Sequence, residues 1–160
     1  MACCSCTSGE QSPVDYVDPL LSVPVSTDIP IREQQCLFGA VQLSPDTRAG
    51  NWDACSGYHY DDTTLKGFSH THLSGTGCID LGDILFRPTT LKPDLTTENI
   101  YQPAAFSHKD EDASAGYYSV VLKEEGIKAE LTVTAHAGMH RYTFPSGKEA
   151  SIINRFDSFA

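Results

Sequence analysis

Positive charge is scarce in this sequence. Its 160 residues include 11 Lys and Arg against 21 Asp and Glu, which gives a formal net charge of −10 at pH 7. Proteins that bind a nucleic-acid backbone need cations to neutralise its phosphates, so this balance argues against a nucleic-acid partner. No apolar run approaches the roughly 18–20 residues of a membrane-spanning helix. We therefore expect neither a nucleic-acid-binding protein nor a membrane span.

Helical periodicity is also missing, because no window of eleven or more residues repeats apolar side chains at i, i+3, i+4 and i+7. Residues 127–135 instead alternate strictly between apolar and polar, which predicts a strand. Its inward side chains should be Ile127, Ala129, Leu131 and Val133. Further strands are predicted at 40–43, 57–60, 67–72, 83–87, 117–123 and 139–144, and at 150–156 as a continuation of the same meander. The charged residues 109–112 are predicted to be a solvated loop. Short strands between Gly, Asp and Pro turns indicate an all-β protein, a twisted antiparallel β-sandwich.

The cysteines lack a zinc pattern, since Cys3 and Cys6 form a single CxxC with no second pair downstream. Cys36, Cys55 and Cys78 are expected to be small buried side chains. Residues 1–14 have neither a charged start nor a full apolar segment of a signal peptide. We interpret them as a disordered remnant of an exported, lipoprotein-like leader, with Cys3, Cys4 or Cys6 as the candidate for lipid attachment. Residues 15–160 are then the sandwich domain.

Two familiar catalytic patterns are absent around His70 and His72. The sequence has no GxSxG turn for a serine nucleophile. An HxH pair followed closely by a glutamate would suggest a metal-dependent jelly-roll enzyme, but the first carboxylate after the pair is Asp80. We therefore predict no metal ligands in this chain. Two residues apart on a strand, the two histidines should share one face, and that face should line a polar cleft.

Two neighbouring stretches are suited to binding a sugar. Trp52 is the only tryptophan, and it lies beside Asp53, so its ring could stack on a pyranose. Gly75-Thr76-Gly77 would let the main chain approach a ligand closely.

Several ordered strings then point to one family: "FGAVQLSPDT", "SGYHYDD", "GFSHTHLSGTGCIDLGDILF", "FSHKDEDASAGYYSV" and "AHAGMHRYTFP". Together they closely resemble the N-terminal β-sandwich domain of glycoside hydrolase family 92, the calcium-dependent exo-acting α-mannosidases. The resemblance covers about residue 15 to the end. It implies an inverting enzyme that trims α-mannosides such as those of N-glycans or mannan. It also implies export in bacteria, to the periplasm or the cell surface.

The resemblance implies roles for parts of this chain. Family members place a second, (α/α)6 domain against the sandwich, with the active site between the two. Acid and base carboxylates and most calcium ligands come from that helical domain, so no catalytic residue is assigned here. The substrate-binding residues that the family motifs imply are Trp52, His70 and His72, with Asp53, Tyr58, His59, Gly75, Thr76 and Gly77 as weaker candidates.

Two differences from the family limit these expectations. The Gly-rich turn that family members carry near their start is missing from residues 22–37. The sandwich also looks incomplete at its C-terminus, so we expect a fragment that is inactive alone. A stand-alone carbohydrate-binding β-sandwich module is the alternative that the residues leave open.

Overall fold

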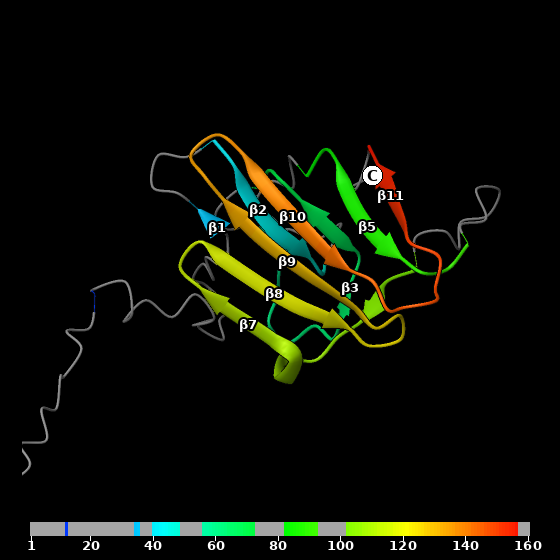
Figure 1. Ribbon diagram of the computed structural model, residues 1–160. Helices are drawn as coiled ribbons and strands as arrows, with labels where there is room; N and C mark the ends of the chain where they lie inside the picture. Colours follow the sequence, from blue (N-terminus) through cyan, green and yellow to red (C-terminus); the bar gives the residue numbers. More distant parts are fainter. Residues whose placement is uncertain are drawn as a thin grey trace, which may run out of the picture.

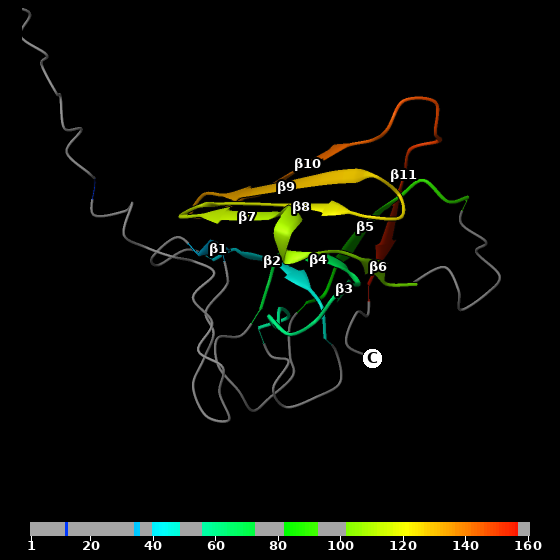
Figure 2. The same ribbon diagram turned by 90° about the horizontal axis from the view of Figure 1, so that it is seen from below.

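The computed structural model describes residues 12, 34–35, 40–48, 56–72, 82–92 and 102–156. These residues form two antiparallel sheets packed face to face and one two-stranded ribbon (Figures 1 and 2). Helical structure in this part of the chain is limited to the 3-10 turn η3 (His108–Asp110). No helix among the described residues is long and apolar enough to cross a membrane. The predicted all-β sandwich is confirmed.

The strands are distributed over three sheets, in which every pair is antiparallel. The five-stranded sheet has the order β1 (Gln34–Gln35), β2 (Gln42–Asp46), β4 (Gly67–Ser69), β5 (Leu85–Thr89) and β11 (Ser151–Arg155). The four-stranded sheet has the order β10 (Gly138–Thr143), β9 (Ile127–Val133), β8 (Tyr117–Leu122) and β7 (Glu111–Ser114). The ribbon pairs β3 (Thr64–Leu65) with β6 (Ala104–Ala105).

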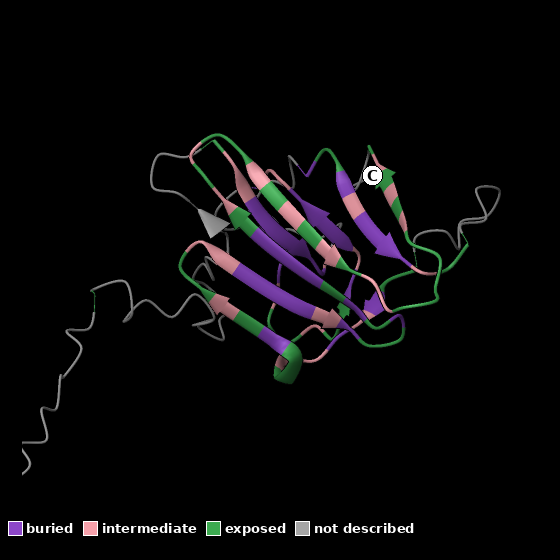
Figure 3. Cartoon of the chain, in the orientation of Figure 1, coloured by how far each residue is buried: buried purple, intermediate pink, exposed green. Residues whose placement is uncertain are grey.

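The core lies between the two large sheets. The predicted inward side chains of β9 are confirmed, because Ile127, Ala129 and Leu131 are almost fully buried and Val133 packs against them, although Glu130 between them is buried as well. Leu43 of β2 and Phe68 of β4 meet these side chains from the other sheet, as members of the same buried cluster. Within the four-stranded sheet burial is greatest on β8 and β9, while β10 at the sheet edge alternates between half-buried and exposed residues (Figure 3).

The last strand does not continue the meander. After β10 the chain turns at residues 145–150 and enters the other sheet, where β11 pairs with β5 from Ser151↔Thr89 to Arg155↔Leu85. The prediction that 150–156 extends the local hairpin series was therefore wrong. Alternation of apolar residues predicts that a strand forms, but the partner strand depends on where the chain is led by the preceding turn.

Candidate functional site

His72 is held at the end of the β2–β4 pair by contacts to both of its ring nitrogens. Nδ1 donates a hydrogen bond to the main-chain carbonyl of Gln42 at 2.8 Å. Nε2 lies 2.8 Å from Asp46 Oδ1 and 2.9 Å from Ser69 Oγ. The residue is only 1% exposed. In this structure it therefore contacts neighbouring protein groups rather than solvent.

His70 lies on the opposite face of the five-stranded sheet. Phe68 belongs to the core between the sheets, and side chains alternate along a strand, so Ser69 points to the outer face. His72 bonds to Ser69 and lies on that outer face, whereas His70 Nε2 lies 3.1 Å from His140 Nε2 in the facing sheet. The prediction that both histidines share one strand face was wrong, because β4 ends at Ser69 and the chain bends at His70.

Gly57 packs directly against His72 and Asp46. A Cβ atom on Gly57 would lie 2.6 Å from His72 Nε2 and 2.7 Å from Asp46 Oδ1, closer than carbon atoms approach in proteins. Its φ of 77° is in the left-handed region, which side chains disfavour. The strand predicted at 57–60 is absent, because the chain bends at Gly57 and turns at Tyr60. Glycine is therefore the only residue that fits at position 57 without strain.

Main-chain hydrogen bonds close the chain on both sides of residues 49–55. The N–H groups of Thr47 and Arg48 both donate to the carbonyl of Gly57, at 2.9 and 3.2 Å. These hydrogen bonds thus join the end of β2 to the chain at Gly57.

A second closure brackets residues 73–81. The N–H of Gly82 donates to the carbonyl of Thr71 at 2.7 Å, directly beside the fixed ring of His72. Because Gly57 contacts His72, the two closures adjoin. We call the residues at this junction the loop anchor: Asp46, Gly57, Ser69 and His72.

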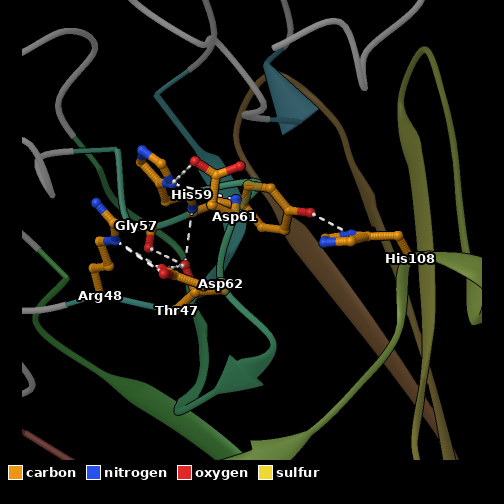
Figure 4. A network of polar contacts seen from close by, with 8 residues as sticks. Thr47, Arg48, Gly57, His59, Asp61, Asp62 and His108 are labelled. Carbon is orange, nitrogen blue, oxygen red and sulfur yellow. Dashed lines mark hydrogen bonds and ion pairs between the residues drawn. The ribbon is translucent and has the colours of Figure 1, made fainter. Parts of the chain in front are cut away.

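A polar network ties the turn at 56–62 to the end of β2 (Figure 4). Arg48 Nε lies 3.0 and 2.9 Å from the two carboxylate oxygens of Asp62. The Thr47 hydroxyl donates to Asp62 Oδ2 at 2.8 Å and accepts the N–H of His59 at 2.8 Å. The turn is therefore fixed independently of its contact with the loop anchor.

Glu111 is the centre of a buried network that the sequence did not reveal. Its two oxygens accept hydrogen bonds from the hydroxyls of Tyr58 at 3.0 Å and Tyr118 at 2.7 Å, and His108 Nδ1 lies 2.7 Å away. The prediction of a solvated loop at 109–112 was wrong for Glu111, which begins β7 and is buried against Tyr118 of the neighbouring strand and the distant Tyr58. Tyr58, a predicted substrate-binding residue, directs its hydroxyl to this carboxylate.

The remaining predicted site residues fall into two groups. His59 is half-buried, and its Nδ1 accepts the N–H of Asp61 at 3.3 Å. The others lie outside the described residues: Trp52, Asp53, Gly75, Thr76 and Gly77.

The described part of the chain does not offer a ligand set for calcium. It contains no group of three or more His, Cys, Asp or Glu side chains that could hold a metal ion. Calcium takes six to eight oxygen ligands, whereas the His70–His140 pair offers two imidazole nitrogens among the rings of Phe68, Phe86 and Tyr142.

Burial and mutual repulsion act on the histidine pair between the sheets. Burial, followed by the charge of His70, lowers the pKa of His140 from 6.5 to about 4. Burial also lowers the pKa of His70, with His72 acting in the same direction and a main-chain hydrogen bond to Gly138 opposing it. Burial raises the pKa of Tyr142, while the charge of Arg87 acts to lower it. The Tyr142 hydroxyl lies 2.7 Å from His140 Nδ1. Because the pKa values of His70 and His140 are both lowered, the two imidazoles are neutral at pH 7.

We expect the sandwich to lose stability between pH 6.5 and 4. The unfolded chain binds a proton at His140 in this window and the folded chain does not, and the lowered pKa of His70 acts in the same direction. Stability is therefore full above pH 6.5 and falls as the pH approaches 4. For a partly buried ring the loss should be about 2 kcal/mol. Thermal unfolding at pH 7.0 and 4.5 measures it. His140→Gln should flatten the dependence, and an equally steep profile in that variant would contradict the assignment.

The sequence profile of the glycosyl hydrolase family 92 N-terminal domain matches residues 28–159. The match covers most of the chain, so the chain belongs to this family, as its N-terminal β-sandwich domain. The family resemblance stated from the sequence is confirmed.

A similar solved structure is a family GH92 alpha-mannosidase from Bacteroides thetaiotaomicron in complex with mannoimidazole. It is 42% identical, with a TM-score of 0.72, over 90% of this chain and 20% of that protein. A second mannosidase of the same species, described as an inverting family GH92 enzyme, shares the fold. Its TM-score is 0.64 at 22% identity, over 91% of this chain and 20% of that protein.

A curated relative is an uncharacterized secreted glycosidase of Arthroderma benhamiae. It is 31% identical over 104 residues, which are 59% of this chain and 13% of the relative. This chain thus spans a fifth or less of the length of these three relatives. Its homologues are glycoside hydrolases. Because the chain covers so little of their length, the activity of the whole protein is considered below as a proposal.

Proposed function

We propose that the chain is the N-terminal, sugar-facing part of an inverting exo-α-mannosidase that acts on the α-1,2-linked and related mannosides of N-glycans or mannan. The observation that carries the proposal is the pair of main-chain closures beside the loop anchor, Thr47 and Arg48 to Gly57 and Gly82 to Thr71, which flank residues 49–55 and 73–81. These two stretches contain Trp52 and the Gly75–Gly77 turn, which the family resemblance implies as sugar contacts. The 42% identical relative solved with mannoimidazole supports the choice of mannosides.

In this proposal the sandwich binds and orients the sugar and transfers no proton. Trp52 covers one face of a mannose ring, since stacking on an aromatic plane buries the apolar side of a pyranose. Asp53 and the main chain at Gly75–Gly77 supply hydrogen bonds to hydroxyl groups. Such positioning raises the rate by holding the scissile bond in a productive geometry. His72 is buried, so it contributes by fixing the loop anchor and does not contact the sugar. His70 packs between the sheets.

The acid and base of hydrolysis are proposed to come from outside this chain. An inverting glycosidase needs two carboxyl groups about 6.5–9.5 Å apart with a water between them. The buried carboxylates of the described residues have other partners: Asp46 bonds to His72, Glu111 to two tyrosines, Glu125 to Arg87, and Glu130 to Arg141. We therefore place the carboxylate pair and the calcium site in the helical domain that the family resemblance implies.

Export is part of the same proposal. The relative from Arthroderma benhamiae is called a secreted glycosidase, and glycans of other cells are reached outside the cytoplasm. A bacterial periplasmic or surface location, with a lipid anchor at Cys3, Cys4 or Cys6, is the form we propose.

The experiment that tests the function compares the complete protein with the 160-residue chain on α-1,2-mannobiose. The complete protein should release mannose, and proton NMR of the first product should detect the β-anomer, because inversion converts the α-linkage. The isolated chain should show no turnover above a buffer blank. Sugar binding without turnover by the complete protein would favour the stand-alone binding module, and turnover by the isolated chain would refute the assignment of its carboxylates.

Replacing Trp52 with alanine in the complete protein should lower kcat/KM on an α-mannoside about ten- to hundredfold, the effect of about 1–3 kcal/mol of lost sugar contact. The control is Met139→Ala, since Met139 is 68% exposed on β10 and lies far in the chain from both loops. Both variants should unfold at the same temperature as the parent within a few degrees. Equal kcat/KM for the two variants would contradict the assignment of Trp52 to the sugar site.

A further inference from the structure

We propose that His72 is a buried imidazolium cation, so that folding takes up one proton at neutral pH and the sandwich loses stability as the solution becomes alkaline. The proton lies between His72 and Asp46, on the outer face of the five-stranded sheet. Both residues belong to the described sandwich, so the pair can be tested whether or not the complete protein hydrolyses mannosides.

The hydrogen-bond partners of His72 require a proton on each ring nitrogen. Nδ1 lies 2.8 Å from the main-chain carbonyl oxygen of Gln42, and a carbonyl can only accept, so Nδ1 is protonated. Nε2 lies 2.8 Å from Asp46 Oδ1. An ionised carboxylate can also only accept, so a second proton lies between these two atoms. The hydroxyl of Ser69, 2.9 Å from Nε2, can accept as well as donate and is compatible with this proton.

The imidazole ring, and not the carboxyl group, holds this second proton. In water a histidine ring is a stronger base than a carboxylate, with an ordinary pKa of about 6.5 against about 3.9. The side chains of His72 and Asp46 are 0% and 2% exposed, and Asp46 Oδ2 has no hydrogen-bond partner among the described residues. A carboxylate buried in this way needs a countercharge, which an imidazolium supplies and a neutral ring does not.

The other charged groups around this pair have different effects. Burial lowers the pKa of Lys66, while the carboxylate of the pair opposes the shift. The titration of Lys66 would therefore make stability rise with pH. Asp62 is paired with Arg48 at 2.9 Å. His70, whose pKa is lowered by burial and further by the charge of His72, is neutral at pH 7. A fall in stability above neutral pH thus distinguishes His72 from these groups.

The proton held by His72 makes stability depend on pH on the alkaline side. Above pH 6.5 the unfolded chain loses this proton and the folded chain keeps it. The stability that the pair contributes is therefore complete below pH 6.5 and falls as the pH rises above it. His70 and His140 have the opposite dependence, because their contribution is lost below pH 6.5. The two sets of histidines should together place the greatest stability near neutral pH.

Nitrogen-15 NMR of the histidines in the 160-residue chain at pH 8 tests the protonation directly. A histidine with both ring nitrogens protonated should be present, and Ser69→Ala should move its signals, because Ser69 Oγ contacts Nε2. Asp46→Asn should convert this ring to the neutral Nδ1–H form, since an amide can donate to Nε2. A parent spectrum in which every histidine is neutral would overturn the proposal. So would a doubly protonated histidine that neither variant affects.

Urea unfolding at pH 7.5 and 8.5 tests the linkage to stability. The unfolding equilibrium constant of the parent should rise about five- to tenfold over this interval, and that of Asp46→Asn should not. The matched control is Glu125→Gln, which changes a buried carboxylate whose partner Arg87 does not titrate in this range. It should be less stable than the parent but keep the dependence on pH.

Equal dependence on pH in the parent and in Asp46→Asn would overturn the proposal. The parent alone decides the question if Asp46→Asn does not fold, because a parent whose stability is constant or rises from pH 7.5 to 8.5 holds no extra proton at His72.

Discussion

Replacing Arg87 with methionine should lower the free energy of unfolding by about 3–5 kcal/mol. Arg87 Nη2 and Glu125 Oε1 are 2.5 Å apart, and the two side chains are only 6% and 5% exposed. Glu125 Oε2 also accepts the N–H of Thr90 at 2.6 Å, and Arg87 Nη1 donates to the Pro88 carbonyl at 2.6 Å. The pair thus joins β5 of one sheet to the β8–β9 turn of the other. Losing the arginine leaves a buried carboxylate without its counter-charge.

Denaturant unfolding of two further variants separates this cause from a general packing defect. Arg87→Met combined with Glu125→Leu should recover most of the loss, to within about 1–2 kcal/mol of the parent, because no unpaired charge remains. Arg141→Met removes a pair on the exposed face of β10, and should cost much less than Arg87→Met even though Arg141 bonds to both oxygens of Glu130. Equal losses at Arg87 and Arg141 would contradict the importance of burial.

Gly57→Ala should destabilise the chain by about 2–4 kcal/mol, from backbone strain and from crowding of His72 and Asp46. Gly116→Ala is a close control, since Gly116 has φ of 78° but nothing lies within 4 Å of the position of its Cβ. That variant should lose about 1–2 kcal/mol, the cost of the backbone conformation alone. Urea unfolding of both variants measures the difference. Equal losses would mean that Gly57 is required for its backbone angle and not for close packing against the loop anchor.

Features fixed by neighbouring residues could be predicted from the sequence. Strict alternation over 127–135 gave β9 and its inward side chains, because a half-buried strand needs that period and no other. The turn before it has Gly126 with φ of 71°, as a short hairpin loop requires.

Features that depend on distant partners could not be predicted in this way. Glu111 stands in a charged run, and only the folded chain brings Tyr58 and Tyr118 to its oxygens. The separation of His70 and His72 to opposite faces follows from a bend at one residue, which reverses the alternation that a longer strand would have kept. The contact of Gly57 with His72 joins residues fifteen positions apart, and a Gly next to Ser and Tyr carries no signal of it.

The measurement that tests the central claim most directly is hydrogen exchange of the complete protein with and without mannoimidazole, the compound bound by the 42% identical relative. If the proposed sugar site includes residues 49–55 and 73–81, peptides that contain them should exchange more slowly in its presence. Peptides from β7 and β8, residues 111–122, should not change. Protection that is absent from both loops, while the compound binds and protects other parts of the protein, would contradict the account.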